Sequence, residues 1–264
     1  MTTIKTKEEI DLMHQGGRIL RSIVDELGKK IDVGVSGKDI EIEAEKLIKG
    51  TGGVPNFRGQ DGFPSCLCFS INEEIVHSVP DERKLKDGDI ATIDLGIFFQ
   101  INTFLKGDID YRKYPNLKNG FHTDMARTYS VGNVNDKIER LLKDNKKALK
   151  KGISKVKAGV KTGEIGEAIE KFAQREGYQV IKNLCGHGIG AKLHEDPEII
   201  HYGSKKYGEI LKEGMVFCIE PMLSLGSDEI FKRGMAYVTD DYSLSAHFED
   251  MVAVTKNGVI VLTD

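Results

Sequence analysis

Acidic and imidazole side chains recur in this sequence inside short apolar segments, where a charge is costly to bury. His187 stands among glycines in the run 186–190, and His194 follows seven residues later. An isolated buried carboxylate needs a cation or several hydrogen-bond donors. One imidazole with several such carboxylates suits manganese, iron(II), cobalt or zinc. Four carboxylates lie in strand-like stretches: Asp94, Asp124, Glu220 and Glu249.

Each of these residues also has an ordinary structural interpretation. Any one carboxylate could lie in a buried salt bridge, which is the simpler interpretation of Asp94 taken alone. His122 lies two residues before Asp124, so both face one side of a strand, and His122 could be a ligand or border the site. The glycines around His187 are expected to permit a tight bend that leaves the imidazole open. The remaining histidines are predicted to lie at the surface or beside the site, His247 nearest to it: His14, His201 and His247.

Two similar halves are expected to bring these side chains together. Residues 7–30 show helical spacing of apolar residues, and Ser36 resembles the cap of a second helix that ends near Gly50. The same order of long helix, Gly-Val turn, helix and short strands restarts about 125 residues later, at residues 136–157. Pockets favour the junction of such units. We therefore predict an α+β fold with its site between the halves and with strands at 66–71, 75–79, 90–98, 121–131, 178–181, 215–219, 230–231, 235–238, 248–255 and 259–262.

The composition is that of an ordinary soluble globular protein. The chain has 264 residues, 39% hydrophobic and 30% charged, and its net charge of −3 offers no general attraction to nucleic acid or membranes. No apolar run approaches the ~20 residues of a membrane helix, and the first residues lack the apolar core of a signal peptide. We therefore expect a cytoplasmic protein. Four cysteines are expected to be reduced thiols: Cys66, Cys68, Cys185 and Cys218.

Two segments stand apart from this plan. Residues 99–120 separate the strand of Asp94 from that of Asp124, and we predict an ordered insertion at the cleft edge or on the outer rim. Residues 136–161, predicted to be helical, carry nine lysines and one arginine. A solvated helix face accounts for this charge. The alternative is a salt-sensitive contact with ribosomal RNA.

The motifs together resemble those of the type I methionine aminopeptidases, which have the pita-bread metallopeptidase fold. The likeness covers the chain apart from about residues 99–120, and the short interval between His194 and Glu220 lacks the insertion of the type II class. It implies one catalytic domain over residues 1–264, a monomer whose two pseudo-symmetric halves curve their strands around a central dimetal site, with helices outside. It rests on seven motifs: Asn72–His77, Ile93-Asp94, His122–Asp124, Gly186–Gly190, His194–Pro197, Ile219–Met222 and Phe248-Glu249.

The resemblance also assigns roles to residues. Glu220 would pass a proton to the leaving amine, His194 would stabilise the oxyanion, and His77 would contact the peptide near the scissile bond. The nucleophile would be a hydroxide that bridges two divalent ions of cobalt, manganese, iron(II) or zinc. Their ligands would be Asp94, Asp124, His187, Glu220 and Glu249, with Asp124 and Glu249 shared by both ions. The pocket for the methionine side chain would comprise Phe63, Cys68, Leu193 and Met235, in a chain without the tryptophan that the family often has there.

The implied activity is the hydrolytic removal of the initiator methionine from nascent polypeptides whose second residue is small. Two alternatives stay open at this point. A proline-specific peptidase would share the fold and prefer X-Pro substrates. A binding module would keep the fold without catalysis and would bind RNA through the lysine-rich helix. Nucleotide binding at residues 186–190 is disfavoured, because the run lacks the G-x-G-x-x-G spacing.

Overall fold

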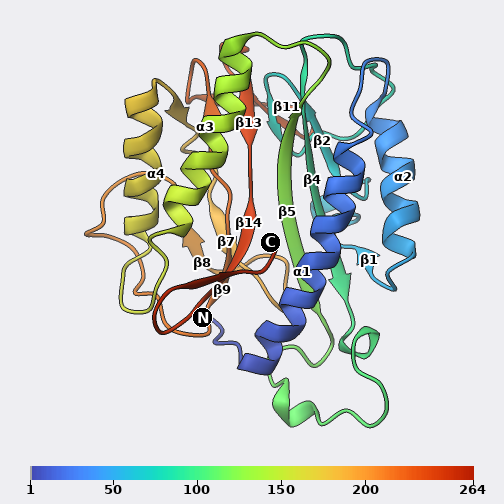
Figure 1. Ribbon diagram of the computed structural model, residues 1–264, viewed down its shortest axis with the longest axis vertical. Coiled ribbons are helices and arrows are strands. Elements are labelled where there is room, and N and C mark those ends of the chain that lie inside the picture. The colour runs from blue at the N-terminus through green and yellow to red at the C-terminus, as the bar shows by residue number, and fades with distance from the viewer. Residues whose placement is uncertain (1) are drawn as a thin grey trace.

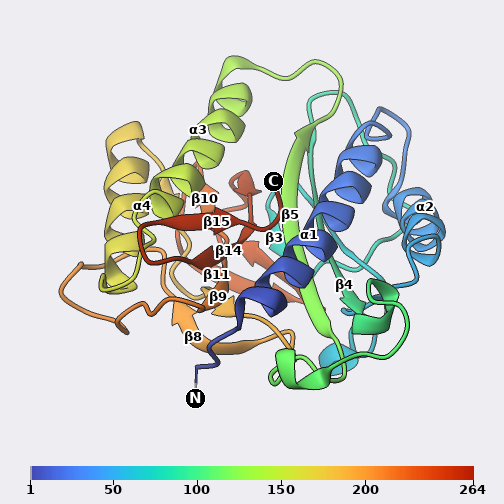
Figure 2. The same ribbon diagram turned by 60° about the horizontal axis from the view of Figure 1, so that its bottom comes forward.

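Two helix-covered halves flank a set of central strands in the computed structural model, which describes residues 2–264 (Figure 1). Helices α1 (Lys7–Gly28) and α2 (Gly37–Lys49) cover one half. Helices α3 (Asp136–Ile153) and α4 (Gly163–Glu176) cover the other. Figure 2, turned by 60°, keeps this division. The predicted repeat of two helix pairs is therefore present in three dimensions. No helix within residues 2–264 has the length and apolarity to cross a membrane.

The helix boundaries follow local capping chemistry. Ser36 caps α2 in a capping box with Asp39, as the sequence predicts. Gly177, with φ of 88°, ends α4 in the left-handed conformation that glycine adopts without strain. Helix α3 ends at Ile153, earlier than predicted, because the chain turns there while Val156 still reaches the core. The last three lysines of the segment 136–161 therefore lie outside the helix.

The strands within residues 2–264 form four small sheets rather than one continuous sheet. The first half contributes a sheet ordered β1-β4-β2 with β5 paired to β4, and the second half contributes sheets ordered β15-β14-β9-β7-β8 and β13-β10-β6. A sheet ordered β11-β12-β3 joins the two halves. In the first half the bounds are β1 Val54–Pro55, β2 Cys68–Ile71, β3 Glu74–Val76, β4 Ile90–Phe99 and β5 Phe121–Ser130. In the second half they are β6 Gln179–Val180, β7 Gly186–Gly188, β8 Glu195–Ile199, β9 Val216–Ile219, β10 Met222–Ser224, β11 Ile230–Arg233, β12 Ala236–Thr239, β13 Ser245–His247, β14 Asp250–Val254 and β15 Val259–Val261.

Several strands lack a counterpart in the predicted set. Strand β7 consists of glycines around one histidine, and β8 is acidic and contains Pro197, so neither carries the apolar alternation of a strand. Their pairing is decided by neighbouring strands: Gly188 pairs with Phe217 of β9. Tertiary context thus overrides local propensity where the histidine must be placed.

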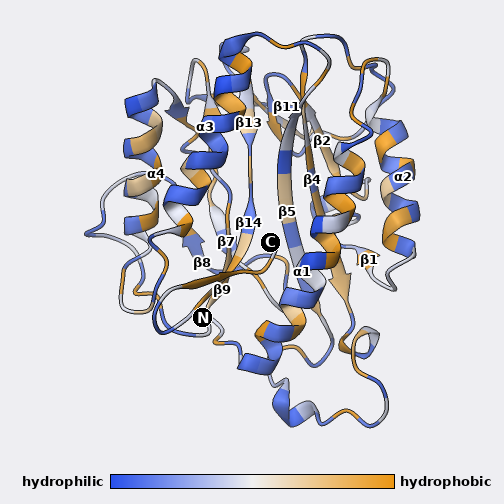
Figure 3. Cartoon of the chain, viewed as in Figure 1, coloured by the Kyte–Doolittle hydropathy of each residue, from blue (hydrophilic) through white to orange (hydrophobic). Residues whose placement is uncertain are grey.

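Each half buries its own apolar cluster beneath its helices. Phe69 and Phe121 are among the fully buried residues of the first cluster, and Phe217 and Ile169 belong to the second. Helix α3 turns Leu141 toward the second cluster, while every lysine of the helix is exposed. Figure 3 shows this division of hydrophilic and hydrophobic residues along the helices. The lysines of α3 therefore lie on the exposed face of the helix, as both interpretations of this segment require.

The insertion forms a compact excursion beyond the ends of β4 and β5, at the bottom of Figure 1. It contains the short 3-10 helices η2 (Ile101–Thr103) and η3 (Tyr111–Lys113). Its end is attached to α1, where the buried carboxylate of Glu9 accepts hydrogen bonds from the Asn116 and Leu117 N–H groups at 2.6 and 3.1 Å. The insertion belongs to the outer rim, since none of residues 99–120 lines the cleft described below.

Candidate active site

Asp94 and Asp124 approach each other because of the register between β4 and β5. Asp94 pairs with Ala126 and Gly96 pairs with Asp124, so both carboxylates project from one face of adjacent strands. The absence of a side chain at residue 96 matters here, because a Cβ would lie 2.2 Å from Asn56 Oδ1. Both aspartates are at least nine-tenths buried, with 8% and 4% exposure.

Glu220 and Glu249 are brought together by a second antiparallel pair. Ile219 at the end of β9 pairs with Asp250 at the start of β14, which places the glutamates side by side just beyond the ladder. The Glu249 N–H donates to the Ala126 carbonyl at 3.0 Å, which attaches this corner to β5 of the other half. Side-chain oxygens of Asp94, Asp124 and Glu249 consequently lie within 4.8 Å of one another.

His187 faces this carboxylate cluster from β7. Its Nδ1 donates to the Gly188 carbonyl at 3.0 Å, so Nε2 is the nitrogen left to accept or to bind a cation. That Nε2 atom lies 3.9 Å from Asp124 Oδ2 and 3.7 Å from Glu220 Oε1. The geometry gives the ring one free lone pair, directed at the acids.

The glycines beside His187 serve a different purpose from the predicted one. Neither Gly186 nor Gly188 has a positive φ, so the expected tight bend is wrong. They permit close approach of neighbouring strands instead: a Cβ at residue 186 would lie 2.3 Å from the Cys218 carbonyl oxygen, and one at residue 188 would lie 2.1 Å from that of Asp196. Alanine at either position would push β7 away from β9 or β8.

The carboxylate cluster is electrostatically incomplete without a cation. Burial, and then repulsion from Glu249, raises the pKa of Asp94 and of Asp124 well above the usual range. Burial raises the pKa of Glu249 to about 7 and lowers that of His187 to about 4. Among the described residues, Asp94 Oδ1 and Glu249 Oε1 have no hydrogen-bond partner. Clustered buried acids with open lone pairs and a neutral imidazole fit a divalent metal site.

Cys218 also lies within reach of His187 and Glu249. Burial and the neighbouring acids raise the pKa of this thiol well above its usual range, so it remains protonated near neutral pH. The predicted ligand set of four acids and one histidine does not include this thiol.

A cleft of about 900 Å³ opens over the cluster and is lined by all five predicted ligands. His194 and His77 also line it. The His194 ring meets the edge of His187 with centroids 4.4 Å apart, and the His77 ring lies 5.6 Å from that of Tyr237. Burial lowers the pKa of both His77 and His194, so each is a neutral hydrogen-bonding group at pH 7. His77 and His194 thus line the cleft that contains the acids and lie outside the candidate ligand groups.

The four residues predicted for the methionine pocket line the same cleft: Phe63, Cys68, Leu193 and Met235. Three are buried, whereas Met235 is partly exposed on the turn between β11 and β12. Lys232 and Tyr237 also line the cleft, and sequence reasoning did not find them. No local sequence pattern predicts these positions. Tyr237 reaches the cleft because it pairs with Val76 of β3.

The other histidines divide into separate environments. His122 packs against Phe98 with ring centroids 4.9 Å apart and is absent from the cleft lining. His201 Nε2 accepts from the Glu220 N–H at 3.2 Å, and His247 Nε2 lies 3.6 Å from Glu220 Oε2. Both are 1% exposed, so they are neighbours of the site and not surface residues. His14 lies outside the site and contacts Asp264 at 3.0 Å.

Arg127 is a further residue that sequence reasoning missed. Its guanidinium donates to the Glu249 carbonyl and pairs with Asp250 Oδ1 at 2.5 Å. Both side chains of this pair are largely buried. The pair supports the backbone of Glu249 from behind, and its only sequence signal is a basic residue three positions after Asp124.

Buried acids and imidazoles gathered at the junction of two α+β halves define a metal-dependent hydrolytic enzyme. The chain belongs to metallopeptidase family M24, whose sequence model matches residues 11–103 and 114–256. The stretch between these two matched segments falls inside the predicted insertion. Use of divalent metal follows from membership of this family together with the candidate ligand groups.

Named relatives extend along the whole chain. It is 39% identical to methionine aminopeptidase 1 of Bacillus subtilis, over 100% of this chain and 99% of the relative, and 36% identical to methionine aminopeptidase of Escherichia coli, over 99% and 93%. The crystal structure of methionine aminopeptidase from Rickettsia prowazekii matches with a TM-score of 0.90 and 32% identity, covering 100% of both chains. The predicted fold and the predicted likeness to methionine aminopeptidases are confirmed.

A prolidase from Pyrococcus horikoshii shares the architecture at a greater distance. Its structure matches with a TM-score of 0.73 and 24% identity, over 99% of this chain and 63% of the prolidase. At that identity the likeness concerns the fold alone.

Proposed function

We propose that this enzyme removes the amino-terminal methionine from peptides and proteins whose second residue is small, and that two divalent ions take part. The observation that carries the proposal is the convergence of five residues of the right chemistry, Asp94, Asp124, His187, Glu220 and Glu249, at the floor of one cleft. Full-length relatives that are named methionine aminopeptidases support the choice of substrate.

The ions would be held by the carboxylate cluster together with His187. Asp94 would help to hold one ion, His187 and Glu220 would help to hold the other, and Asp124 and Glu249 would contribute to both. Cobalt, manganese, iron(II) and zinc all accept this set of oxygen and nitrogen donors. When bound, the ions supply Lewis acidity toward the scissile carbonyl and make water nucleophilic near neutral pH.

The remaining cleft residues orient the peptide and handle protons. His194, held neutral by burial, donates a ring N–H to the carbonyl oxygen as negative charge develops there. Glu220 passes a proton to the leaving amine, and its position is supported by His201 behind its backbone N–H. His77 contacts the peptide beside the scissile bond. Each role depends on a side chain that the fold orients before substrate arrives.

Selection of methionine falls to the apolar wall of the cleft. Phe63, Cys68, Leu193 and Met235 offer a soft apolar surface that suits an unbranched thioether. The free amino group of the substrate belongs near the acids at the floor, which restricts cleavage to the first residue. The single catalytic domain predicted over the whole chain supplies all of these groups.

We propose that the substrates are the amino termini of nascent polypeptides, that the enzyme acts in the cytoplasm, and that it is a monomer. The exposed lysines of α3, among them Lys143 and Lys147, give a surface for weak, salt-sensitive contact with ribosomal RNA.

The direct test supplies purified enzyme and a divalent metal with Met-Ala-Ser, Met-Lys-Ser and an X-Pro dipeptide. We expect methionine to be released from Met-Ala-Ser and much more slowly from Met-Lys-Ser. Absence of release from Met-Ala-Ser across the four metals would reject the proposal. Preferential cleavage of the X-Pro dipeptide would favour a proline-specific peptidase instead.

A further inference from the structure

A buried carboxylate held by two arginines lies next to the active cleft but outside it. The Glu74 side chain is 3% exposed, while those of Arg83 and Arg233 are 48% and 42% exposed. Glu74 Oε1 lies 2.8 Å from Arg83 Nη2 in an ion pair and accepts a hydrogen bond from Arg233 Nη2 at 2.9 Å, while Oε2 accepts from Arg83 Nη2 at 3.1 Å. Glu74 Oε2 also accepts from the Ile71 N–H at 3.0 Å. We call the set Glu74, Arg83 and Arg233 the arginine clamp.

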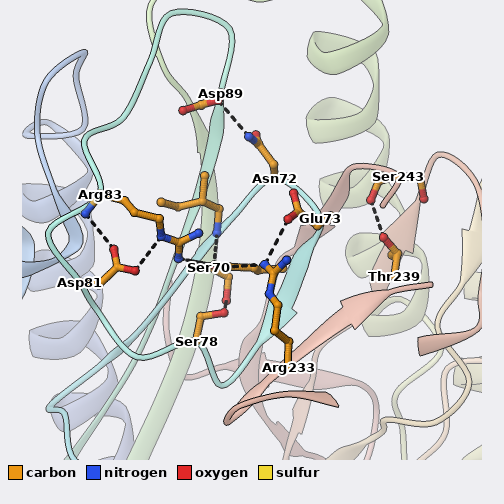
Figure 4. A network of polar contacts seen from close by, with 12 residues as sticks. Ser70, Asn72, Glu73, Ser78, Asp81, Arg83, Asp89, Arg233, Thr239 and Ser243 are labelled. Carbon is orange, nitrogen blue, oxygen red and sulfur yellow. Dashed lines mark hydrogen bonds and ion pairs between the residues drawn. The ribbon is translucent and has the colours of Figure 1, made fainter. Parts of the chain in front are cut away.

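Each arginine is itself oriented by another acid. Arg83 Nε donates to Asp81 Oδ2 at 2.6 Å, and Arg233 Nη2 donates to Glu73 Oε1 at 3.1 Å. Figure 4 shows the two guanidinium groups entering from different segments, with their partners around them. A partly exposed ion pair contributes little by itself, but a network around a buried carboxylate fixes geometry, because loss of a partner leaves a buried charge uncompensated.

The arginine clamp ties together the two halves of the molecule. Glu74 belongs to β3 of the first half, and Arg233 ends β11 of the second. Glu74 also pairs with Val238 of β12 in the only sheet that contains strands from both halves in residues 2–264. The clamp joins β3 to β11 through side chains, and the backbone ladder joins β3 to β12, so both hold the same three-stranded sheet together.

Two residues next to this sheet, His77 and Met235, line the active cleft. His77 follows β3 directly and has φ of 60°, a conformation that a non-glycine residue keeps only when its surroundings impose it. Met235 follows Arg233 by two residues and lines both the active cleft and a cavity of about 350 Å³ bordered by Glu74, Arg83 and Arg233. Met235 thus stands between the clamp and the cleft.

We propose that the arginine clamp is a positioning element that holds the β11–β12 turn and so sets the fit of Met235 against the first side chain of the substrate. The inference rests on the proposed function, since it assigns the control of substrate selectivity to residues that touch no substrate. Arg233 acts through Met235, while Glu74 and Arg83 fix Arg233.

The test measures kcat and KM for Met-Ala-Ser and Leu-Ala-Ser with wild type, Arg233→Met and Arg233→Lys. Arg233→Met raises KM for Met-Ala-Ser and lowers the methionine-over-leucine ratio of kcat/KM by about fivefold, because the pocket wall loosens. Arg233→Lys retains most of the ratio, since an ammonium group still pairs with Glu74. Arg175→Met, which removes an exposed arginine of α4 paired with Glu176, serves as the matched control and leaves the ratio unchanged.

A ratio for Arg233→Met within about twofold of wild type would overturn the proposal, because distant or silent changes fall within that range. Should Arg233→Met not fold, Glu74→Gln takes its place, and an unchanged ratio in that variant would overturn the proposal equally. Addition of Arg233→Met to Met235→Ala should produce no further loss of selectivity. Independent, additive losses would contradict action through Met235.

A substrate-free measurement separates this inference from the proposed function. Amide hydrogen exchange of residues 235–239 should be about tenfold faster in Arg233→Met than in wild type, with exchange in α4 unchanged. Equal exchange in both proteins would refute the clamp even in an active enzyme. Failure of the proposed function would be recognised by a different result, namely that the wild-type enzyme releases no methionine.

Discussion

The carboxylate cluster and the methionine pocket share one cleft but are built from different kinds of residue. The cluster consists of charges that would be unfavourable alone, with Asp94 and Glu249 each leaving a buried oxygen without a hydrogen-bond partner among the described residues. The pocket consists of side chains such as Phe63 and Leu193, which any apolar core would accept. The cluster therefore indicates a function, because its buried carboxylates need a cation that the protein itself does not supply. The apolar residues of the pocket have no comparable need and do not indicate one.

This difference has an energetic consequence. Removal of a charge from the cluster takes away a ligand and also relieves repulsion, so activity and metal-free stability should move in opposite directions. Truncation in the pocket removes apolar contacts, so activity should change through substrate fit. Three substitutions and one change of pH test whether activity and stability respond differently in the cluster and in the pocket.

The largest effect is expected for Asp124→Asn. The value of kcat/KM for Met-Ala-Ser should fall by about 10³-fold or more, because a ligand proposed to serve both ions is lost. In EDTA the variant should unfold at a temperature equal to or above that of wild type, since an amide relieves the repulsion among buried acids. Calorimetry and steady-state kinetics measure the two quantities, with the exposed Asp240→Asn as control. A variant with lower metal-free stability and intact activity would contradict the proposed difference between the cluster and the pocket.

His194→Ala should lower kcat by about 10²–10³-fold with little change in KM, the range found for loss of one oxyanion donor. The number of metal ions bound should remain that of wild type, because His194 borders the acids without belonging to them. Kinetics together with metal analysis of the purified variant provide the check, and the control is His14→Ala on α1. A loss of bound metal in this variant would indicate that His194 is itself a metal ligand.

Met235→Ala should reduce kcat/KM for Met-Ala-Ser by about tenfold, mainly through KM, as expected for lost apolar contacts in a side-chain pocket. Metal affinity should not change. A competition assay between Met-Ala-Ser and Leu-Ala-Ser gives the selectivity directly. A variant that discriminates as well as wild type would show that the pocket lies elsewhere in the cleft.

The smallest effect concerns pH and follows from the raised pKa of Glu249, about 7. An acid whose folded pKa is raised stabilises the metal-free fold at low pH, and this stabilisation is lost as pH rises through the folded value. The metal-free protein should lose stability from this residue progressively between about pH 5 and pH 7, and the loss should level off above pH 7. The metal-loaded protein should show no such loss, because its acids are already ionised. Thermal unfolding with Mn²⁺ or EDTA measures the difference, and Glu249→Gln should weaken the metal-free trend, to which Asp94 and Asp124 also contribute.

The sequence correctly predicted the helices and strands whose formation depends on local residue patterns. The apolar runs around Asp94 and Asp124 predicted strands β4 and β5, and the cap at Ser36 predicted α2. Sequence reasoning mistook the role of the glycines at 186 and 188, because a close approach between strands leaves no trace in the turn chemistry of a single segment.

The neighbours of the acids were harder to predict. His201 and His247 support Glu220, and Arg127 supports Glu249, yet each is distant in sequence from the group it contacts or carries no pattern. The wall formed by Tyr237 depends on the pairing of β3 with β12, a contact between halves. Long-range pairing of this kind is decided by the assembled fold and not by local propensity.

The central claim is that five side chains from two halves together bind divalent ions. Crystals grown with Mn²⁺ and measured for anomalous scattering test this most directly. We predict anomalous peaks enclosed by Asp94, Asp124, His187, Glu220 and Glu249. Crystals of a catalytically active, manganese-loaded enzyme that show no peak among these residues would contradict the claim.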